Sequence, residues 1–216
     1  MLGIINFEVF LISSILLNIT PGPDTMYVLG RSVAQGKRAG IVSALGITAG
    51  GVVHTLLAAF GLSVILMSSA VLFNVIKVIG AIYLTYLGIR MLIDKASPKA
   101  KSHGGPADMP SELSNSKIFT QGLFTNVTNP KVAMFFLAFM PQFIAPGSDA
   151  SPLPFVVLGL TYCLTGGIWS ILIAAFSSTA TGKLRNNVKM KTILNKATGF
   201  IFIAMSITLL RTKAVE

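Results

Sequence analysis

Charged side chains are scarce in this sequence. Only 11% of its 216 residues are Asp, Glu, Lys or Arg, whereas 53% are hydrophobic. An ordinary globular domain carries about 25% charged residues. This shortage argues against a soluble globular domain and indicates a protein that lies in a membrane.

Cysteine and histidine are almost absent as well. Cys163 is the only cysteine, which excludes a disulfide within the chain, a CxxC redox centre and a cysteine-rich metal site. The two histidines, His54 and His103, lie far apart in different sequence contexts. We therefore expect no metal and no cofactor. This excludes most classes of membrane redox enzyme.

The sequence is rich in long apolar runs. A helix needs about 20 apolar residues to cross roughly 30 Å of hydrocarbon. Such runs recur near residues 4–30, 40–66, 71–92, 119–145, 153–178 and 192–210. The first run lacks a basic start and a cleavage site and carries Glu8, so we do not interpret it as a cleavable signal. The predicted fold is all-α, a polytopic membrane protein with six transmembrane helices.

Basic residues gather in alternate loops between these predicted helices. The formal net charge is +10, and three loop regions hold most of it: Arg31, Lys37 and Arg38; then Arg90, Lys95, Lys99, Lys101 and Lys117; then Lys183, Arg185, Lys189, Lys191 and Lys196. The loops at 67–70 and 141–152 hold none. This distribution follows the positive-inside rule, so we expect the basic loops in the cytoplasm and both termini outside. It also argues against nucleic acid as the partner of the positive charge.

The sequence repeats itself weakly. GGVVHTLLAAF at 50–60 aligns with GGIWSILIAAF at 166–176, NITPGP at 18–23 with NVTNPK at 126–131, and KVIG at 77–80 with KATG at 196–199. The matches occur in the same order, so we divide the chain into a first three-helix repeat at 1–94, a basic cytoplasmic linker at 95–118 and a second repeat at 119–216. An odd number of helices inverts the second repeat across the membrane. Inverted repeats with interrupted helices are typical of transporters whose substrate site lies between the halves.

Prolines interrupt the first helix of each repeat. Proline lacks a backbone N–H and clashes with the carbonyl four residues earlier, so Pro21 and Pro23 should release the carbonyls of Leu17 and Ile19, and Pro130 that of Asn126. Each half-helix that follows begins with free amides and the positive end of its dipole. The residues expected to bind substrate lie at these breaks: Pro21, Gly22, Pro23, Asp24, Asn126, Asn129, Pro130 and Lys131.

Charges at the two breaks match a zwitterion. Asp24 and released carbonyls suit an ammonium group, and Lys131 with the half-helix amides suits a carboxylate. The alternatives are that Asp24 only caps a helix and that Lys131 extends to an interface. A charge inside a membrane costs at least about 2.5 kcal/mol on insertion scales, which favours functional roles.

Four further polar residues are candidates outside these two breaks. His54 is either a hydrogen-bonded packing residue or a proton relay, and Asn18 is expected to satisfy backbone groups released by the prolines. Lys77 and Lys196 occupy equivalent repeat positions and are equally compatible with interfacial and functional roles.

These motifs resemble the LysE/RhtB family of bacterial amino-acid exporters. The likeness lies in NITPGPDTMYVLGRSVAQGKRAG at 18–40, GITAGGVVHTLLAAFGLS at 46–63, IKVIGAIYLTYLGIRML at 76–92 and GLFTNVTNPKVAMFFLAFMPQFI at 122–144. It covers nearly the whole chain apart from the linker. The T-P-G-P-D and N-P-K blocks together are its most specific part.

The resemblance implies a multi-pass secondary transporter of the bacterial inner membrane that exports amino acids, driven by protons. Apart from Asp24, the only acidic residue in the six predicted membrane runs is Glu8 near the outer end, so we expect a small neutral substrate such as threonine or homoserine. The expected mechanism is alternating access around the two broken helices, with Asp24, and His54 as an alternative, coupling export to protons.

Expected partners are the amino acid, protons and membrane lipid, and the sequence leaves open whether the chain forms a homo-oligomer. The main alternative is a metal or other inorganic ion exporter, for which Asp24, Cys163 and His54 are the only ligands at hand. A membrane-embedded enzyme or scaffold is the remaining alternative, but nothing orients Ser170 and His54 as a catalytic pair.

Overall fold

The computed structural model describes residues 3–62, 70–93, 113–145 and 151–185, together with residues 192, 193, 196, 199, 200, 202–204, 206, 207 and 210. Over this part the chain is helical, and its only β pairing is an isolated bridge between Ile4 and Ile144. The all-α prediction is therefore confirmed for the described residues. Most of the predicted linker, residues 94–112, lies outside them.

The first predicted break is present. Helix α1 (Phe7–Ile19) ends two residues before Pro21, and α2 (Pro23–Leu57) begins with Pro23 in its first turn. Proline suits this position because the first N–H groups of a helix have no intrahelical partner. Between the two helices, the N–H and the hydroxyl of Thr20 both donate to the Leu16 carbonyl, at 3.1 and 2.7 Å.

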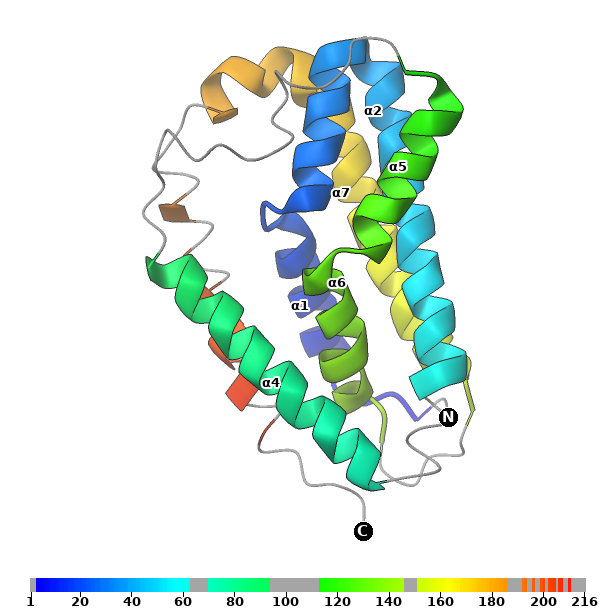
Figure 1. The fold of residues 1–216 in the computed structure, drawn as a ribbon, viewed down its shortest axis with the longest axis vertical. Coiled ribbons are helices and arrows are strands. Elements are labelled where there is room, and N and C mark those ends of the chain that lie inside the picture. The colour runs from blue at the N-terminus through cyan, green and yellow to red at the C-terminus, as the bar shows by residue number, and fades with distance from the viewer. Residues whose placement is uncertain are drawn as a thin grey trace.

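Helix α2 is a hairpin rather than one rod. Gly36 has φ 82° and ψ 178°, a conformation open almost only to glycine, and the ribbon reverses there (Figure 1). The loop predicted at 31–39 is thus a tight turn, and the second arm continues into the π turn η1 (Ala58–Leu62). Arg31 does not lie in a loop: it is 3% exposed and donates to Gln35 and Gln121, because the first arm stays helical almost to the turn.

The second break is present too. Helix α5 (Asn115–Val127) ends just before Asn129, whose side-chain oxygen accepts from the Lys131 N–H and caps α6 (Pro130–Met134). The chain continues through a π turn, η3 (Phe135–Phe139), and a 3-10 turn, η4 (Met140–Phe143).

The broken segments run in opposite directions. In Figure 1, α1 and the first arm of α2 rise through the molecule, whereas α5 and α6 descend beside them, and the two breaks lie at a similar height. Helix α7 (Leu153–Arg185) rises between them and packs against both α1 and α2.

Helix α4 (Ala70–Ile93) slants along one side and contacts the C-terminal residues. Thr85 and Ser206 share a hydrogen bond of 2.7 Å, and a Cβ on Gly88 would lie 2.8 Å from the Gly199 carbonyl. The two segments therefore cross at close range, which small residues permit.

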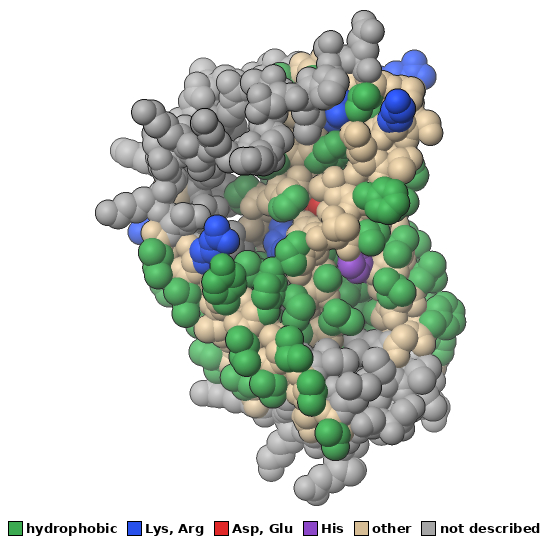
Figure 2. Space-filling view, in the orientation of Figure 1, with side chains coloured by type: hydrophobic (Ala, Val, Ile, Leu, Met, Phe, Trp, Pro, Cys, Tyr) green, Lys and Arg blue, Asp and Glu red, His purple; other side chains and the backbone are tan. Residues whose placement is uncertain are grey.

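By length and composition, two of the described helical stretches could cross a membrane, Pro23–Gly61 and Leu153–Phe176, and Phe7–Ile19 and Val78–Arg90 are shorter apolar helices. Large apolar side chains such as Phe60, Ile82 and Leu164 are more than 60% exposed. Figure 2 shows hydrophobic side chains over much of one face, mostly below the visible lysines and arginines. An apolar exterior of this kind suits lipid rather than water.

Candidate functional site

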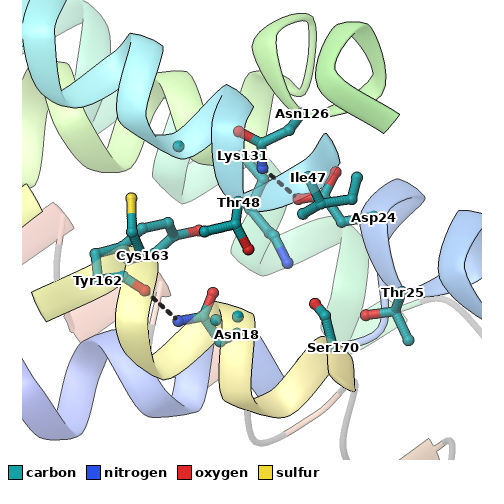
Figure 3. A pocket seen from close by; sticks show the side chains of 13 residues that line it. Asn18, Asp24, Thr25, Ile47, Thr48, Asn126, Lys131, Tyr162, Cys163 and Ser170 are labelled. Atoms are coloured by element: carbon teal, nitrogen blue, oxygen red, sulfur yellow. Dashed lines mark hydrogen bonds between the residues drawn. The ribbon is translucent and has the colours of Figure 1, made fainter. Parts of the chain in front are cut away.

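The two helix breaks meet at a pocket. The Asn126 side-chain amide, at the end of α5, donates to the Asp24 carboxylate at 2.8 Å, in the first turn of α2. Residues from α1, α2, α5, α6 and α7 line this pocket (Figure 3): Asn18, Asp24, Thr25, Ile47, Thr48, Gly51, Asn126, Lys131, Tyr162, Cys163, Gly166, Gly167 and Ser170. The sequence expectation that the two broken segments come together is met for Asp24, Asn126 and Lys131.

The carbonyl of Asn126 receives a substitute partner. Proline at 130 cannot donate to it, and the carbonyl accepts instead from the Asn129 N–H at 2.9 Å and lies 3.2 Å from His54 Nε2. The His54 ring is buried and stacks on Phe136, with ring centroids 5.5 Å apart. His54 thus packs on Phe136 and lies within hydrogen-bond distance of the end of α5.

The carbonyls at the end of α1 are satisfied by a lysine. Lys131 Nζ donates to the Leu17 carbonyl at 3.1 Å and to the Thr20 carbonyl at 3.2 Å. Leu17 is the residue whose carbonyl Pro21 was predicted to release. Carbonyls at a helix C-terminus carry partial negative charge, so an ammonium is favoured there.

Lys131 thus donates its hydrogen bonds to the helix end across the break, with Asp24 near enough to attract its charge. Asp24 itself accepts a hydrogen bond from Asn126. The sequence analysis gave the released carbonyls to a substrate's ammonium and did not consider the Lys131 ammonium as their partner.

Polar atoms without partners surround the same place. Asp24 Oδ1, Asn126 Oδ1 and Asn129 Nδ2 are buried and make no hydrogen bond among the described residues. A buried acceptor without a donor costs on the order of 1–3 kcal/mol, and more when it is charged. Two of these atoms are acceptors on residues that line the pocket, so the pocket is short of a donor.

Asparagine and glycine meet twice across the pocket. Asn126 packs on α2, where a Cβ on Gly50 would lie 2.7 Å from the Asn126 Cβ. Asn18 packs on α7, where a Cβ on Gly166 would lie 2.9 Å from Asn18 Oδ1. The repeat alignment pairs Asn18 with Asn126 and Gly50 with Gly166. Each Asn–Gly contact is therefore the equivalent of the other, with the two halves of the chain interchanged. Asn18 in addition donates to the Tyr162 carbonyl and the Thr165 hydroxyl, at 3.3 and 3.1 Å.

An aromatic cluster closes the pocket on one side, and polar hydrogen bonds between α2 and α5 close it on another. On the side of η3 and η4 lies an aromatic cluster of Phe10, Phe135, Phe136, Phe139, Phe143 and Tyr162, of which Tyr162 lines the pocket. On the side of α5, Tyr27 donates to the Ile118 carbonyl at 2.8 Å and Arg31 donates to Gln121 at 3.1 Å, which joins α2 to α5. The cavity between measures about 30 Å³. This is room for one or two water molecules, so an amino acid can enter only after the helices separate.

Several lining residues were missed by the sequence analysis. Thr48, Tyr162 and Cys163 lie within four residues of a paired glycine, and that proximity was the signal available in the sequence. Of the weaker candidates, Lys196 is exposed, and the side chain of Lys77 lies outside what the structure describes.

The chain is similar to known proteins over nearly its whole length. Residues 15–213 match the model of a family described as "LysE type translocator". The chain is 28% identical to proteins named "Leucine efflux protein" from Enterobacter sp. (strain 638) and from Klebsiella pneumoniae, over 94% of each chain in both cases. It is 27% identical to a protein of the same name from Salmonella typhimurium, again over 94% of each chain. No solved structure matches it significantly.

Proposed function

Since this chain belongs to the LysE type translocator family and is a transporter rather than an enzyme, we propose that it exports neutral amino acids through the pocket between the two helix breaks. The observation that carries the proposal is the pair of buried, unpartnered acceptors, Asp24 Oδ1 and Asn126 Oδ1, in a pocket with one carboxyl side chain. An ammonium group supplies the missing donors.

The substrate's ammonium binds at Asp24. An ammonium has three N–H donors and a carboxylate is its strongest acceptor, so Asp24 Oδ1 with Asn126 Oδ1 gives it two oriented partners. The Asn126 amide is oriented by its own hydrogen bond to Asp24, which leaves its oxygen for the substrate.

The substrate's carboxylate binds at the start of α2. The N-cap of α2 is Gly22, which has no capping side chain, and Met26 is the first residue to donate back to the Gly22 carbonyl. The amides of Asp24 and Thr25 precede it and have no intrahelical partner, and Thr25 lines the pocket. Helix amides and the positive end of the dipole bind carboxylates in many proteins.

Transport follows by alternating access. The exchanged Asn–Gly contacts and the opposite directions of the broken segments support two inverted three-helix repeats that rock against each other. The aromatic cluster opens on one side and the Tyr27–Arg31–Gln121 contacts open on the other. Asp24 releases the substrate's ammonium and takes up a proton, which couples export to the proton gradient.

The substrate is a neutral amino acid. Asp24 is the only acidic side chain among the residues that line the pocket, so no second carboxylate is left for a basic side chain. The relatives' names favour leucine, while the sequence argument favoured threonine or homoserine. All three belong in the first assay.

Export of an inorganic cation fits less well. Tight sites for transition metals draw on several His, Cys, Asp or Glu side chains. The described residues contain no group of three such side chains that could hold a metal ion.

The membrane and orientation follow from the same proposal. We place the protein in the bacterial inner membrane as a multi-pass protein, with the turn of α2 at Lys37 and Arg38 in the cytoplasm. The start of α1 is then outside.

Efflux from proteoliposomes tests the proposal. Vesicles loaded with a mixture of amino acids that includes leucine, threonine, homoserine and lysine are diluted into buffer with and without a pH gradient. Selective, gradient-stimulated loss of a neutral amino acid is expected. Loss of none of them, from vesicles that contain monodisperse protein, would contradict the proposed function.

Replacing His54 with Gln distinguishes packing from proton coupling. The Gln amide can donate to the Asn126 carbonyl as His54 does, but it cannot titrate. We expect gradient-stimulated efflux to stay within about threefold of the unmodified protein, the size of a small packing change. Efflux that continues but no longer responds to the gradient would assign coupling to His54.

A further inference from the structure

We propose that Lys131 is a tethered stand-in for the substrate's ammonium. In the empty protein its ammonium binds the carbonyls at the end of α1. When substrate enters, the amino acid's ammonium, held by Asp24 and Asn126, takes over these carbonyls with its remaining N–H. This inference rests on the proposed function, because it takes the pocket at the breaks as the substrate site.

The first observation is the set of acceptors that Lys131 occupies. Its Nζ lies 3.1 Å from the Leu17 carbonyl and 3.2 Å from the Thr20 carbonyl, both at the end of α1. Pro21 removes the N–H that would otherwise reach the Leu17 carbonyl. The end of α1 is therefore built to hold a cation that does not come from its own helix.

The second observation is that this cation borders the substrate pocket. Lys131 lines the same cavity as Asp24 and Asn126 (Figure 3), whose free acceptor oxygens attract the substrate's ammonium. Like charges repel, more strongly where water is excluded. The two cations therefore occupy this region in turn, the lysine ammonium when the pocket is empty and the substrate's ammonium when it is filled.

The third observation is the space left for the lysine side chain. A Cβ on Gly22 would lie 3.2 Å from Lys131 Nζ and 3.6 Å from its Cε. Gly22 has φ −156°, an extended conformation that any residue can adopt. Alanine at this position would therefore press on the ammonium end of Lys131 without straining the backbone.

A tethered cation acts in only one half of the transport cycle. During net efflux the carrier must return empty, and Lys131 then satisfies the α1 carbonyls. During exchange of one amino acid for another the carrier crosses loaded in both directions, and the substrate's ammonium satisfies them. Lys131 is therefore a positioning residue for the empty carrier and is dispensable for exchange.

Replacing Lys131 with Met separates the two modes of transport. Methionine keeps much of the length and loses the charge. We expect net efflux into amino-acid-free buffer to fall about tenfold or more, the usual scale for a lost charge-assisted hydrogen bond. Exchange against external amino acid should stay within about threefold. Gly22→Ala should lower the ratio of net efflux to exchange in the same direction, by less.

The experiment compares both modes in the same proteoliposomes. Labelled internal amino acid is followed after dilution into buffer with or without the unlabelled amino acid. Lys117→Met is the matched control, because Lys117 is an exposed lysine near the start of α5, and it should change neither mode. If Lys131→Met does not purify as a monodisperse protein, Gly22→Ala carries the test.

The outcomes separate this inference from the proposed function. A selective loss of net efflux supports the stand-in role. Equal loss of both modes overturns it and assigns Lys131 to the substrate's carboxylate, and unchanged net efflux overturns it as well. Absence of both modes for every amino acid in the unmodified protein would instead refute the proposed function.

Discussion

Replacing Asp24 with Asn is expected to abolish both net efflux and exchange. The substitution keeps the shape of the side chain and its reach to Asn126 but removes the carboxylate that the substrate's ammonium needs. Removing one partner of a buried charge pair costs about 2–5 kcal/mol, so binding should weaken by roughly 30-fold to several thousandfold. The measurement is binding of labelled amino acid to the purified variant, followed by both transport modes in proteoliposomes.

Glu8→Gln is the control for this prediction. It makes the same carboxylate-to-amide change in the first turn of α1, where Glu8 is exposed and lies outside the pocket. Binding and transport should be unchanged in it. If Asp24→Asn keeps full affinity but loses stimulation by the gradient, Asp24 carries only the proton. If it keeps both properties, the pocket is not the substrate site.

Replacing Gly46 with Ala is expected to destabilise the fold more than the other glycine-to-alanine substitutions, Gly22→Ala and Gly61→Ala. A Cβ on Gly46 would collide with the backbone of Phe119 in α5, which cannot turn aside as a side chain can. Alanine otherwise favours a helix over glycine by about 1 kcal/mol. Overpacking costs typically about 1–3 kcal/mol, and contact with backbone places this case at the upper end. The free energy of unfolding in detergent should fall.

Gly61→Ala is the matched change. Gly61 lies in η1, further along the same arm, and a Cβ there meets no atom within 4 Å. Its stability should equal or exceed that of the unmodified protein. Equal stability of the two variants would show that α2 and α5 do not approach at Gly46 as the structure has them.

The helix breaks could be predicted from the sequence because their cause is local. Pro21, Pro23 and Pro130 each remove a backbone donor wherever the rest of the chain goes. The predicted release of the Leu17 and Asn126 carbonyls is borne out, since both accept from side chains distant in sequence. Which side chains those are could not be predicted, because Lys131 and His54 reach them across the fold.

Two other differences between the sequence analysis and the structure also arise from contacts between distant parts of the chain. Arg31 looked like a loop residue because basic residues follow it closely, but the chain turns only at Gly36, and the guanidinium is then buried against Gln121 on α5. Cys163 was considered only for disulfide, redox and metal sites, yet it lines the pocket. In both cases tertiary contacts decide the role of the residue, and a pattern in the sequence does not show them.

The central claim is that the two helix breaks recognise the ammonium and carboxylate of one amino acid. Its most direct test is a calorimetric titration of the purified protein with the exported amino acid, its N-acetyl derivative and its methyl ester. The account predicts binding of the amino acid alone, because the N-acetyl derivative lacks the group for Asp24 and the ester lacks the group for the amides of α2. Binding of the N-acetyl derivative as tightly as the free amino acid would contradict it.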